Sequence, residues 1–286
     1  MTYEELLRLG IKKANEYNME EEAVRFLLLE TYTGSQASFY TNLKEEADYN
    51  IELLFLKRLD EFLINKIPIQ HLLGYAYFHG HKFIVNSDVL IPRRETEELV
   101  EHIIHFVEEK YNKTAIKVLD LGSGSGCIGL TLKKELPYLD VTLADISEKA
   151  LAVSKENSKL LNVDVNFIKS NWFNNINEKY DVIVSNPPYI PNDEQLADIV
   201  KKEPNLALFG GSKGLDFYEV ILKDIKNHIK EKGMLFFEHG YQHKEAIFNL
   251  AEKYFKEAKI FQYKDLQNKD RFTILIWGEL WKKVNS

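Results

Sequence analysis

Residues 1–74 carry apolar side chains at helical spacing, which predicts a small bundle of short helices. Thr2 and Glu5 have the spacing of a capping box, in which each side chain bonds the backbone N–H of the other residue. Residues 45–66 form the longest helical pattern, and Pro68 follows as its stop. We expect its apolar side chains on one broad face: Leu53, Leu54, Leu56, Leu59, Phe62 and Leu63.

The pattern changes after residue 74. Residues 75–94 are rich in aromatic and β-branched side chains, with glycines and an Asn-Ser-Asp turn, and predict a β-hairpin linker. From residue 95 to residue 286, helical and extended patterns alternate. Strands are expected at residues 116–121, 141–146, 165–169, 180–185, 233–238 and 271–277. This alternation is typical of an α/β domain with a doubly wound, mostly parallel sheet and helices on both faces.

Composition and charge exclude several classes of protein. Hydrophobic residues make up 45% and charged residues 28% of the chain, which favours a sizeable core over disorder. The formal net charge of −7 argues against a chain-wide affinity for nucleic acid or anionic lipid. Cys127 is the single cysteine, so it has no partner within the chain for a disulfide. No apolar run approaches the ~20 residues that span a bilayer, and no leader pattern precedes the first helix, so we expect a cytoplasmic protein.

A glycine-rich turn follows the first expected strand of the α/β domain and leads into a helix. It consists of Gly122, Ser123, Gly124, Ser125 and Gly126. Glycine lets a ligand approach the backbone closely because it has no Cβ. Asp145 ends the next strand, where a carboxylate can accept hydrogen bonds from both hydroxyls of a ribose. A tight turn without a ligand, a dinucleotide site and an S-adenosylmethionine site all fit; the displaced third glycine favours S-adenosylmethionine.

The third expected strand ends in Ser170, Asn171 and Trp172. Their polar groups and the indole ring can contact an adenine by hydrogen bonding and stacking. A core aromatic at a strand end is the alternative interpretation of Trp172. Both interpretations stay open at the level of sequence.

The fourth strand leads into Asn186, Pro187, Pro188 and Tyr189, at the edge where open α/β sheets bind their ligands. Two prolines fix the backbone and remove two donors, so the Asn186 side-chain oxygen and the Pro187 carbonyl can act as acceptors. These two acceptors fit the two N–H bonds of a planar amino group, and Tyr189 can pack on its flat face. Such a site presents the nitrogen to an incoming methyl group by positioning and electrostatics, without a metal or a strong general acid.

The order of the segments DLGSGSG, LAD, SNW and SNPPY resembles class I methyltransferases that act on an amino or amide nitrogen. Residues 68–100, together with EPNLALFGGSKGLDFY and FFEHGYQ, are similar to the peptide chain release factor glutamine methyltransferases, the HemK/PrmC family. The resemblance covers residues 68–271 and implies a seven-stranded Rossmann-like sheet. It implies that a methyl group passes from S-adenosylmethionine to the glutamine side-chain amide in the Gly-Gly-Gln motif of class 1 release factors, which modulates translation termination.

For the cofactor, the resemblance implies that the glycine loop holds the methionyl part, Asp145 the ribose and Trp172 the region of the adenine. Asn186 would touch both cofactor and substrate. Two positions depart from the family's usual pattern. Arg94 stands where a proline is usual, and Asn171 stands where an aspartate commonly precedes the tryptophan.

For the substrate, the resemblance implies a glutamine site formed by Asn186, Pro187, Pro188 and Tyr189, with Asn186 and Pro187 as the catalytic residues. The partner is then a release factor, with no direct binding of nucleic acid and no membrane contact. Residues 1–74 carry none of these motifs, so we expect the helical domain to dock the body of the protein substrate.

Three alternatives stay open. A sister group acts on a glutamine of a ribosomal protein. A nucleic acid adenine N6-methyltransferase shares the N-P-P-Y chemistry. Such an enzyme must flip a base and bind phosphates, and the net negative charge of this chain argues against that. A non-catalytic binding protein could also keep the fold. No metal is expected, because the pairs His79/His81 and His102/His105 have no third ligand at a telling distance along the chain.

Overall fold

The computed structural model describes residues 1–278, and the chain forms two compact units. The helical unit comprises residues 1–74 together with residues 196–202. The sheet unit comprises residues 75–195 and the chain from residue 203 onward, so it includes the hairpin. The last eight residues of the predicted domain 95–286 lie outside the described residues.

Short helices build the helical unit: α1 (Tyr3–Glu16), α2 (Glu21–Thr31), α3 (Gln36–Thr41), α4 (Tyr49–Leu63), α5 (Ile69–Leu73) and the 3₁₀ turn η1 (Val200–Lys202). The capping box of Thr2 and Glu5 is confirmed at the start of α1. The broad apolar face predicted for α4 is wrong in part, because Leu53 and Leu54 are 55% and 41% exposed. The helix buries a narrower stripe at a spacing of three or four residues: Ile51, Phe55, Leu59, Phe62 and Leu63.

The predicted hairpin consists of β1 (Tyr75–Phe78) and β2 (His81–Ile84), paired antiparallel. His79 and Gly80 form its turn, both with positive φ (50° and 75°), as a tight two-residue hairpin turn requires. Phe78 and Phe83 are fully buried in the core of the sheet unit. The hairpin is therefore packed onto the α/β domain and is more than a connection.

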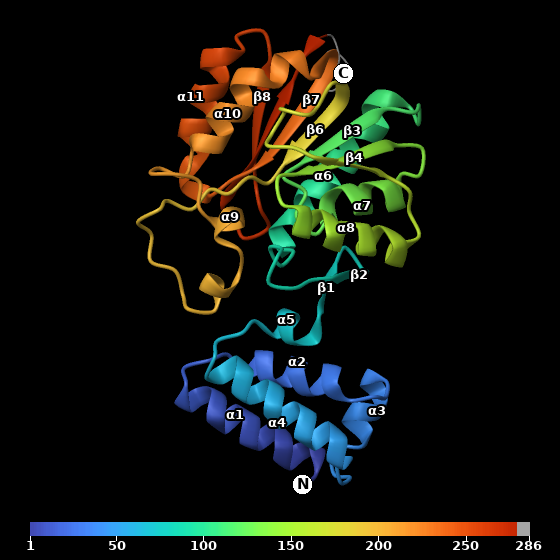
Figure 1. The fold of residues 1–286 in the computed structure, drawn as a ribbon, viewed down its shortest axis with the longest axis vertical. Helices are drawn as coiled ribbons and strands as arrows, with labels where there is room; N and C mark the ends of the chain where they lie inside the picture. The colour runs from blue at the N-terminus through green and yellow to red at the C-terminus, as the bar shows by residue number, and fades with distance from the viewer. Residues whose placement is uncertain (279–286) are drawn as a thin grey trace. The chain divides into compact units, whose positions relative to one another are not determined.

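Within the described residues, seven strands form one sheet in the order β5-β4-β3-β6-β7-β9-β8 (Figure 1). They are β3 (Lys117–Leu121), β4 (Asp140–Asp145), β5 (Asn166–Lys169), β6 (Tyr180–Ser185), β7 (Ile229–Glu238), β8 (Lys259–Lys264) and β9 (Asp270–Ile276). β9 runs antiparallel to both of its neighbours, β7 and β8, and all the other pairs of neighbouring strands are parallel. The predicted fold class is confirmed. The sequence patterns missed β8, because this edge strand is only half-buried and begins and ends with lysine.

Helices cover both faces of the sheet (Figure 1): α6 (Arg94–Tyr111), α7 (Cys127–Glu135), α8 (Glu148–Leu161), α10 (Asp216–Asp224) and α11 (Lys244–Tyr254), with a short α9 (Asn205–Leu208) and 3₁₀ turns η2 (Ile225–Asn227) and η3 (Tyr241–His243). Alternate side chains of β3 point to opposite faces of the sheet. Val118 packs in the core with α6 and α7, whereas Leu119 and Leu121 pack with α10 and α11. In residues 1–278, no helix has the length and apolar character needed to cross a membrane.

Candidate active site

A pocket lies at the carboxyl ends of the parallel strands of the sheet unit, beside the point where the strand order reverses between β3 and β6. It is lined by segments that follow four of these strands: residues 121–125 after β3, 145–147 after β4, 170–172 after β5, and Asn186 and Pro188 after β6. The structure therefore brings the motifs predicted from the sequence together around one cavity.

The glycines of the loop all have positive φ: 78° at Gly122, 54° at Gly124 and 80° at Gly126. Side chains other than glycine are strained in this conformation. Gly122 and Gly124 line the pocket, and a Cβ on Gly124 would meet no atom within 4 Å, so a ligand can approach there. Gly126 does not line the pocket. It caps α7, and a Cβ there would lie 2.9 Å from the Leu130 side chain and 3.0 Å from Cβ of Ser154.

Ser123 and Ser125 are buried and also line the pocket. The Ser123 Oγ has no hydrogen-bond partner among the described residues. A buried hydroxyl without a partner costs free energy, so this atom is suited to bond a ligand. The Ser125 carbonyl accepts a hydrogen bond from the Asn157 side chain of α8 (2.9 Å), which also bonds the backbone of Ile84 in β2. Asn157 thus fixes the loop against the hairpin, a role that no local pattern indicates.

Two carboxylates fix the backbone of the glycine loop and of the helix that follows it. Asp145 accepts hydrogen bonds from the N–H groups of Gly124 (2.8 Å) and Ser147 (2.9 Å). Burial raises the pKa of Asp145, and these backbone donors counteract the shift. Asp120, inside β3, accepts from the N–H of Gly129 at 2.9 Å, and burial raises its pKa to about 7. Asp145 faces the pocket, as the ribose interpretation requires, while Asp120 braces the start of α7.

Trp172 lines the pocket and has a positive φ of 50°. The Ser170 hydroxyl donates to its carbonyl (2.6 Å), which stabilises this bend. Phe217 of α10 lies 4.9 Å away, ring centre to ring centre, and lines the same pocket. Trp172 also packs against the core, so the pocket and core interpretations both describe it. Phe217 was not found from sequence, because its segment carries no local sign of a ligand.

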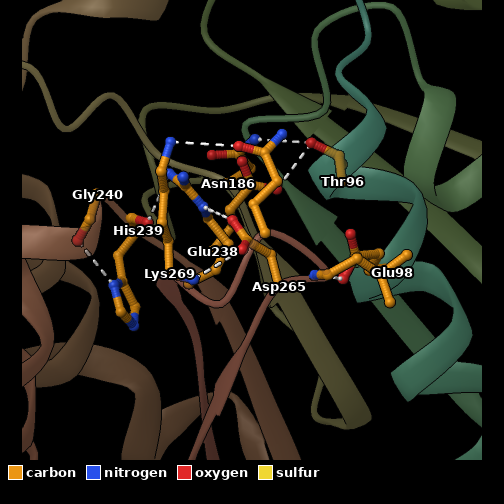
Figure 2. Close-up of polar contacts among 11 residues, drawn as sticks. Thr96, Glu98, Asn186, Glu238, His239, Gly240, Asp265 and Lys269 are labelled. Atoms are coloured by element: carbon orange, nitrogen blue, oxygen red, sulfur yellow. Dashed lines mark hydrogen bonds and ion pairs between the residues drawn. The ribbon is translucent and has the colours of Figure 1, made fainter.

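Asn186 belongs to a polar network on the pocket wall (Figure 2). Its side-chain nitrogen donates to the Thr96 hydroxyl (3.3 Å), and that hydroxyl donates to the Glu238 carboxylate (2.7 Å). Thr96 and Glu238 are almost completely buried, and burial raises the pKa of Glu238 to about 7. Because the nitrogen end of the Asn186 amide is held on this side, the oxygen end is turned away from Thr96 and is the acceptor that can face a ligand.

Further hydrogen bonds hold Glu238 and the segment after β7 (Figure 2). The Tyr218 hydroxyl donates to the Glu238 carbonyl (2.8 Å), and Arg271 donates to the carbonyl of His239 (3.3 Å). Nδ1 of His239 lies 3.0 Å from a carbonyl, which only accepts, so Nδ1 carries the proton and Nε2 accepts from the Thr273 hydroxyl. Burial lowers the pKa of His239 to about 4. The imidazole is therefore neutral near pH 7 and acts as a brace.

The rest of the tetrapeptide divides between pocket and core. Pro188 lines the pocket, Pro187 is buried and does not line it, and Tyr189 packs against the core. Burial raises the pKa of the Tyr189 hydroxyl to about 12. The structure thus places Asn186 and Pro188 at the cavity wall, and Pro187 and Tyr189 behind it.

A strap of residues 205–214 runs beside the tetrapeptide. Ile190 donates its N–H to the Leu208 carbonyl (3.0 Å), and Gly210 donates to the Ile190 carbonyl (2.8 Å). Leu206 and Ala207 of the strap line the pocket. The strap therefore pairs with the backbone of Ile190, the residue that directly follows the tetrapeptide.

The loop after the hairpin is fixed by a buried carboxylate. Glu203 accepts from the Ile91 N–H (2.9 Å) and forms an ion pair with Arg93. The side chain of Glu203 is 2% exposed, so this pair is well shielded from solvent. Arg94 is the first residue of α6 and is exposed. Proline also fits the first position of a helix, because its missing N–H has no partner within the helix there.

Comparison with known proteins agrees with this geometry. Residues 99–204 match the family described as Methyltransferase small domain. A release factor glutamine methyltransferase of Bacillus cereus is 34% identical over 273 residues, which cover 93% of this chain and 96% of that protein. The protein of the same name from Streptococcus pneumoniae is 36% identical over 279 residues, with 96% of each chain covered.

Solved structures agree on the fold. A methyltransferase from Pyrococcus furiosus has a TM-score of 0.51 at 15% identity and covers 81% of this chain and 100% of its own. The hMettl16 catalytic domain has a TM-score of 0.54 at 12% identity, and the match covers 86% of this chain and 94% of that domain. At this identity the likeness concerns the class I methyltransferase fold alone. The full-length relatives decide the family: this chain belongs to the release factor glutamine methyltransferases of the HemK/PrmC type.

Proposed function

We propose that this protein transfers a methyl group from S-adenosylmethionine to the side-chain amide nitrogen of the glutamine in the Gly-Gly-Gln motif of class 1 peptide chain release factors, in the cytoplasm. One observation carries the proposal: Asn186, Thr96 and Glu238 form a chain of bonds that fixes an amide acceptor on the wall of the glycine-loop pocket. The names of the relatives in Bacillus cereus and Streptococcus pneumoniae support the substrate.

The residues present fit S-adenosylmethionine. Its amino acid end, which carries both an ammonium and a carboxylate group, suits the loop at Gly122 and Gly124, where the backbone is open and the Ser123 hydroxyl is without a partner among the described residues. The Asp145 carboxylate, at the end of β4, is the acceptor for the ribose hydroxyls. Trp172 and Phe217 supply flat apolar surface for the adenine. When bound, S-adenosylmethionine supplies a methyl group already activated on a sulfonium.

The substrate amide needs acceptors for its two N–H bonds. The Asn186 side-chain oxygen supplies one, because its nitrogen is already committed to Thr96. The Pro187 ring is buried behind the cavity wall, so we assign the second acceptor to its backbone carbonyl. We assign the rest of the glutamine site to Pro188, which lines the pocket, and to Tyr189, which lies behind it. Asn186 and Pro187 thus fix the position of the amide nitrogen, which gains the methyl group and releases one proton to solvent. Rate enhancement comes from positioning and from preorganised dipoles.

The division of the chain supports a division of roles. The pocket is lined by residues of the sheet unit alone. We therefore assign the body of the release factor to the helical unit, residues 1–74, and the glutamine-bearing loop to the sheet unit. Removal of residues 1–74 should abolish methylation of a whole release factor while binding of S-adenosylmethionine persists. Undiminished methylation of the whole factor by residues 75–286 would refute the docking role.

The test of function is mass spectrometry of a class 1 release factor incubated with this protein and S-adenosylmethionine. We expect a gain of one methyl group on the Gly-Gly-Gln glutamine. Asn186→Ala should lower the rate by about 10²- to 10³-fold, as the loss of one preorganised polar contact does elsewhere. Asn192→Ala is the matched control, because Asn192 is exposed in the same loop and does not line the pocket.

The outcomes separate the alternatives. If the protein binds S-adenosylmethionine and the release factor but adds no methyl group, the proposed function is wrong. If the protein instead methylates a glutamine of a ribosomal protein, the proposed reaction stands and the proposed substrate is wrong. Methylation of adenine in nucleic acid, with binding that weakens steeply as salt rises, would replace the substrate class altogether.

A further inference from the structure

A second cluster of chemically active side chains lies on the hairpin, outside the pocket. His79 and His81 flank Gly80 in the turn, and Glu135 is the last residue of α7. One ligand atom from each of the three lies within 4.8 Å of the others. None of the three lines the pocket described above. The sequence separates Glu135 from His81 by 54 positions, which is why no third ligand was evident from the chain alone.

The spacing of the ligand atoms suits a tetrahedral metal ion. Nε2 of His81 lies 2.9 Å from Oε1 of Glu135, and Nδ1 of His79 lies 4.0 Å from the same oxygen. In a tetrahedral zinc site with bonds of about 2.0–2.2 Å, neighbouring ligand atoms are roughly 3.3–3.5 Å apart. The two observed separations lie on either side of this value. Since all three side chains are partly exposed, changes of well under 1 Å bring them into position.

Glu101 of α6 orients one of the two imidazoles. Its Oε1 lies 2.6 Å from Nε2 of His79, so the proton of the neutral ring is held at Nε2 and the lone pair of Nδ1 faces Glu135. In zinc sites a histidine ligand usually donates its other ring N–H to a carboxylate or a carbonyl, which fixes the orientation of the ring. The backbone is fixed as well, because the N–H of His79 donates to Glu97 of the same helix (3.0 Å).

We infer that His79, His81 and Glu135 form a binding site for Zn²⁺ or a similar transition-metal ion, completed by solvent. Two imidazoles and one carboxylate suit zinc, whereas magnesium and calcium prefer oxygen ligands throughout. The ion joins the hairpin to α7, and through Glu101 to α6. Because α7 begins at the glycine loop and α6 carries Thr96, the site stabilises the framework of the pocket without taking part in the reaction.

The experiment uses tag-free, full-length protein that has been freed of metal with a chelator. Addition of Co²⁺ should produce the visible absorption of a tetrahedral site with nitrogen and oxygen ligands, and Zn²⁺ should displace it at one ion per chain. Competition with a chromophoric chelator then gives the affinity for Zn²⁺. We expect His81→Gln and Glu135→Gln each to weaken Zn²⁺ binding at least tenfold, and Glu101→Gln to weaken it about tenfold with the stoichiometry unchanged.

His105→Gln is the matched control, because His105 is an exposed histidine of α6 that faces a single carboxylate, Glu109, at 3.9 Å. It should leave the affinity for Zn²⁺ unchanged. Zn²⁺ should raise the thermal midpoint of the parent protein but not of His81→Gln. The inference is overturned if the parent shows no tetrahedral Co²⁺ spectrum, or if His81→Gln and Glu135→Gln bind Zn²⁺ as tightly as the parent.

Discussion

Gly210 lies against the backbone of the tetrapeptide Asn186–Tyr189, to which we assign the glutamine site, and replacing it by alanine tests how closely that backbone must be held. The N–H of Gly210 donates to the Ile190 carbonyl at 2.8 Å. A Cβ at position 210 would overlap the carbonyl oxygen of Pro188 and would lie 2.9 Å from Cα of Tyr189. Gly210 is not among the glycines with positive φ, so the added methyl group acts through this overlap and not through backbone strain.

The size of the effect follows from these contacts. Ordinary contacts of a Cβ begin at 3.4 Å, and the value to Cα of Tyr189 is 2.9 Å. The tetrapeptide therefore has to move by about 0.5 Å or more, which reaches the ~0.5 Å tolerance within which a catalytic group must be held. A misplacement of about 1 Å costs roughly 100-fold in rate, or about 2.7 kcal/mol of activation free energy. We expect Gly210→Ala to lower kcat by about 10- to 100-fold.

The assay compares methyl transfer to a release factor with binding of S-adenosylmethionine by calorimetry. Cofactor affinity should change little, because the glycine loop and Asp145 lie on other strands. Gly233→Ala is the control: its Cβ would lie 2.6 Å from the Ile229 side chain at the amino end of β7, so it strains the core without touching the tetrapeptide. A folded Gly210→Ala protein with kcat within threefold of the parent would refute the reasoning.

Three further predictions concern single groups. Burial raises the pKa of Glu238 from 4.5 to about 7, so the stability that its protonated form contributes is complete below pH 4.5 and is lost as the pH rises through 7. Glu238→Gln should remove up to about 3 kcal/mol of the pH dependence of the free energy of urea unfolding, and the same pH dependence in variant and parent would contradict this. Ser185→Ala deprives the buried Leu121 carbonyl of its donor (2.6 Å) and should cost about 1–3 kcal/mol in the same assay; a loss below about 0.5 kcal/mol would argue against the bond. Trp172→Ala should weaken S-adenosylmethionine binding at least about fivefold by calorimetry, whereas unchanged affinity would remove Trp172 from the adenine region.

The parts of the site that sequence predicted are local ones. A glycine at alternate positions after a buried strand marks a turn with positive φ, and Gly122, Gly124 and Gly126 all adopt it. Asp145 and Asn186 were placed correctly at strand ends because a parallel sheet brings its carboxyl ends to one edge. The alternation of helical and extended segments along the chain was enough to predict a mostly parallel sheet with helices on both faces.

The parts that sequence missed depend on distant segments. The edge strand β8 has no clear alternation, because solvent reaches it and half-burial does not select a pattern. Leu53 and Leu54 were predicted on the broad apolar face from helical spacing, whereas the neighbouring helices of the unit cover only part of α4. Glu203 acts on Ile91 across 112 positions, a relation that no local rule expresses.

The orientation of the Asn186 amide is a property of the site that the sequence does not predict. Its residue type follows from the chemistry, because an amide offers both a donor and an acceptor. Which end faces the pocket is decided by Thr96, 90 positions earlier, and through it by Glu238, at the end of a different strand. Without those two partners the amide could rotate and present its nitrogen, which would repel the N–H bonds of a substrate amide. The role that we propose for Asn186 therefore depends on the folded network, and the tetrapeptide alone does not determine it.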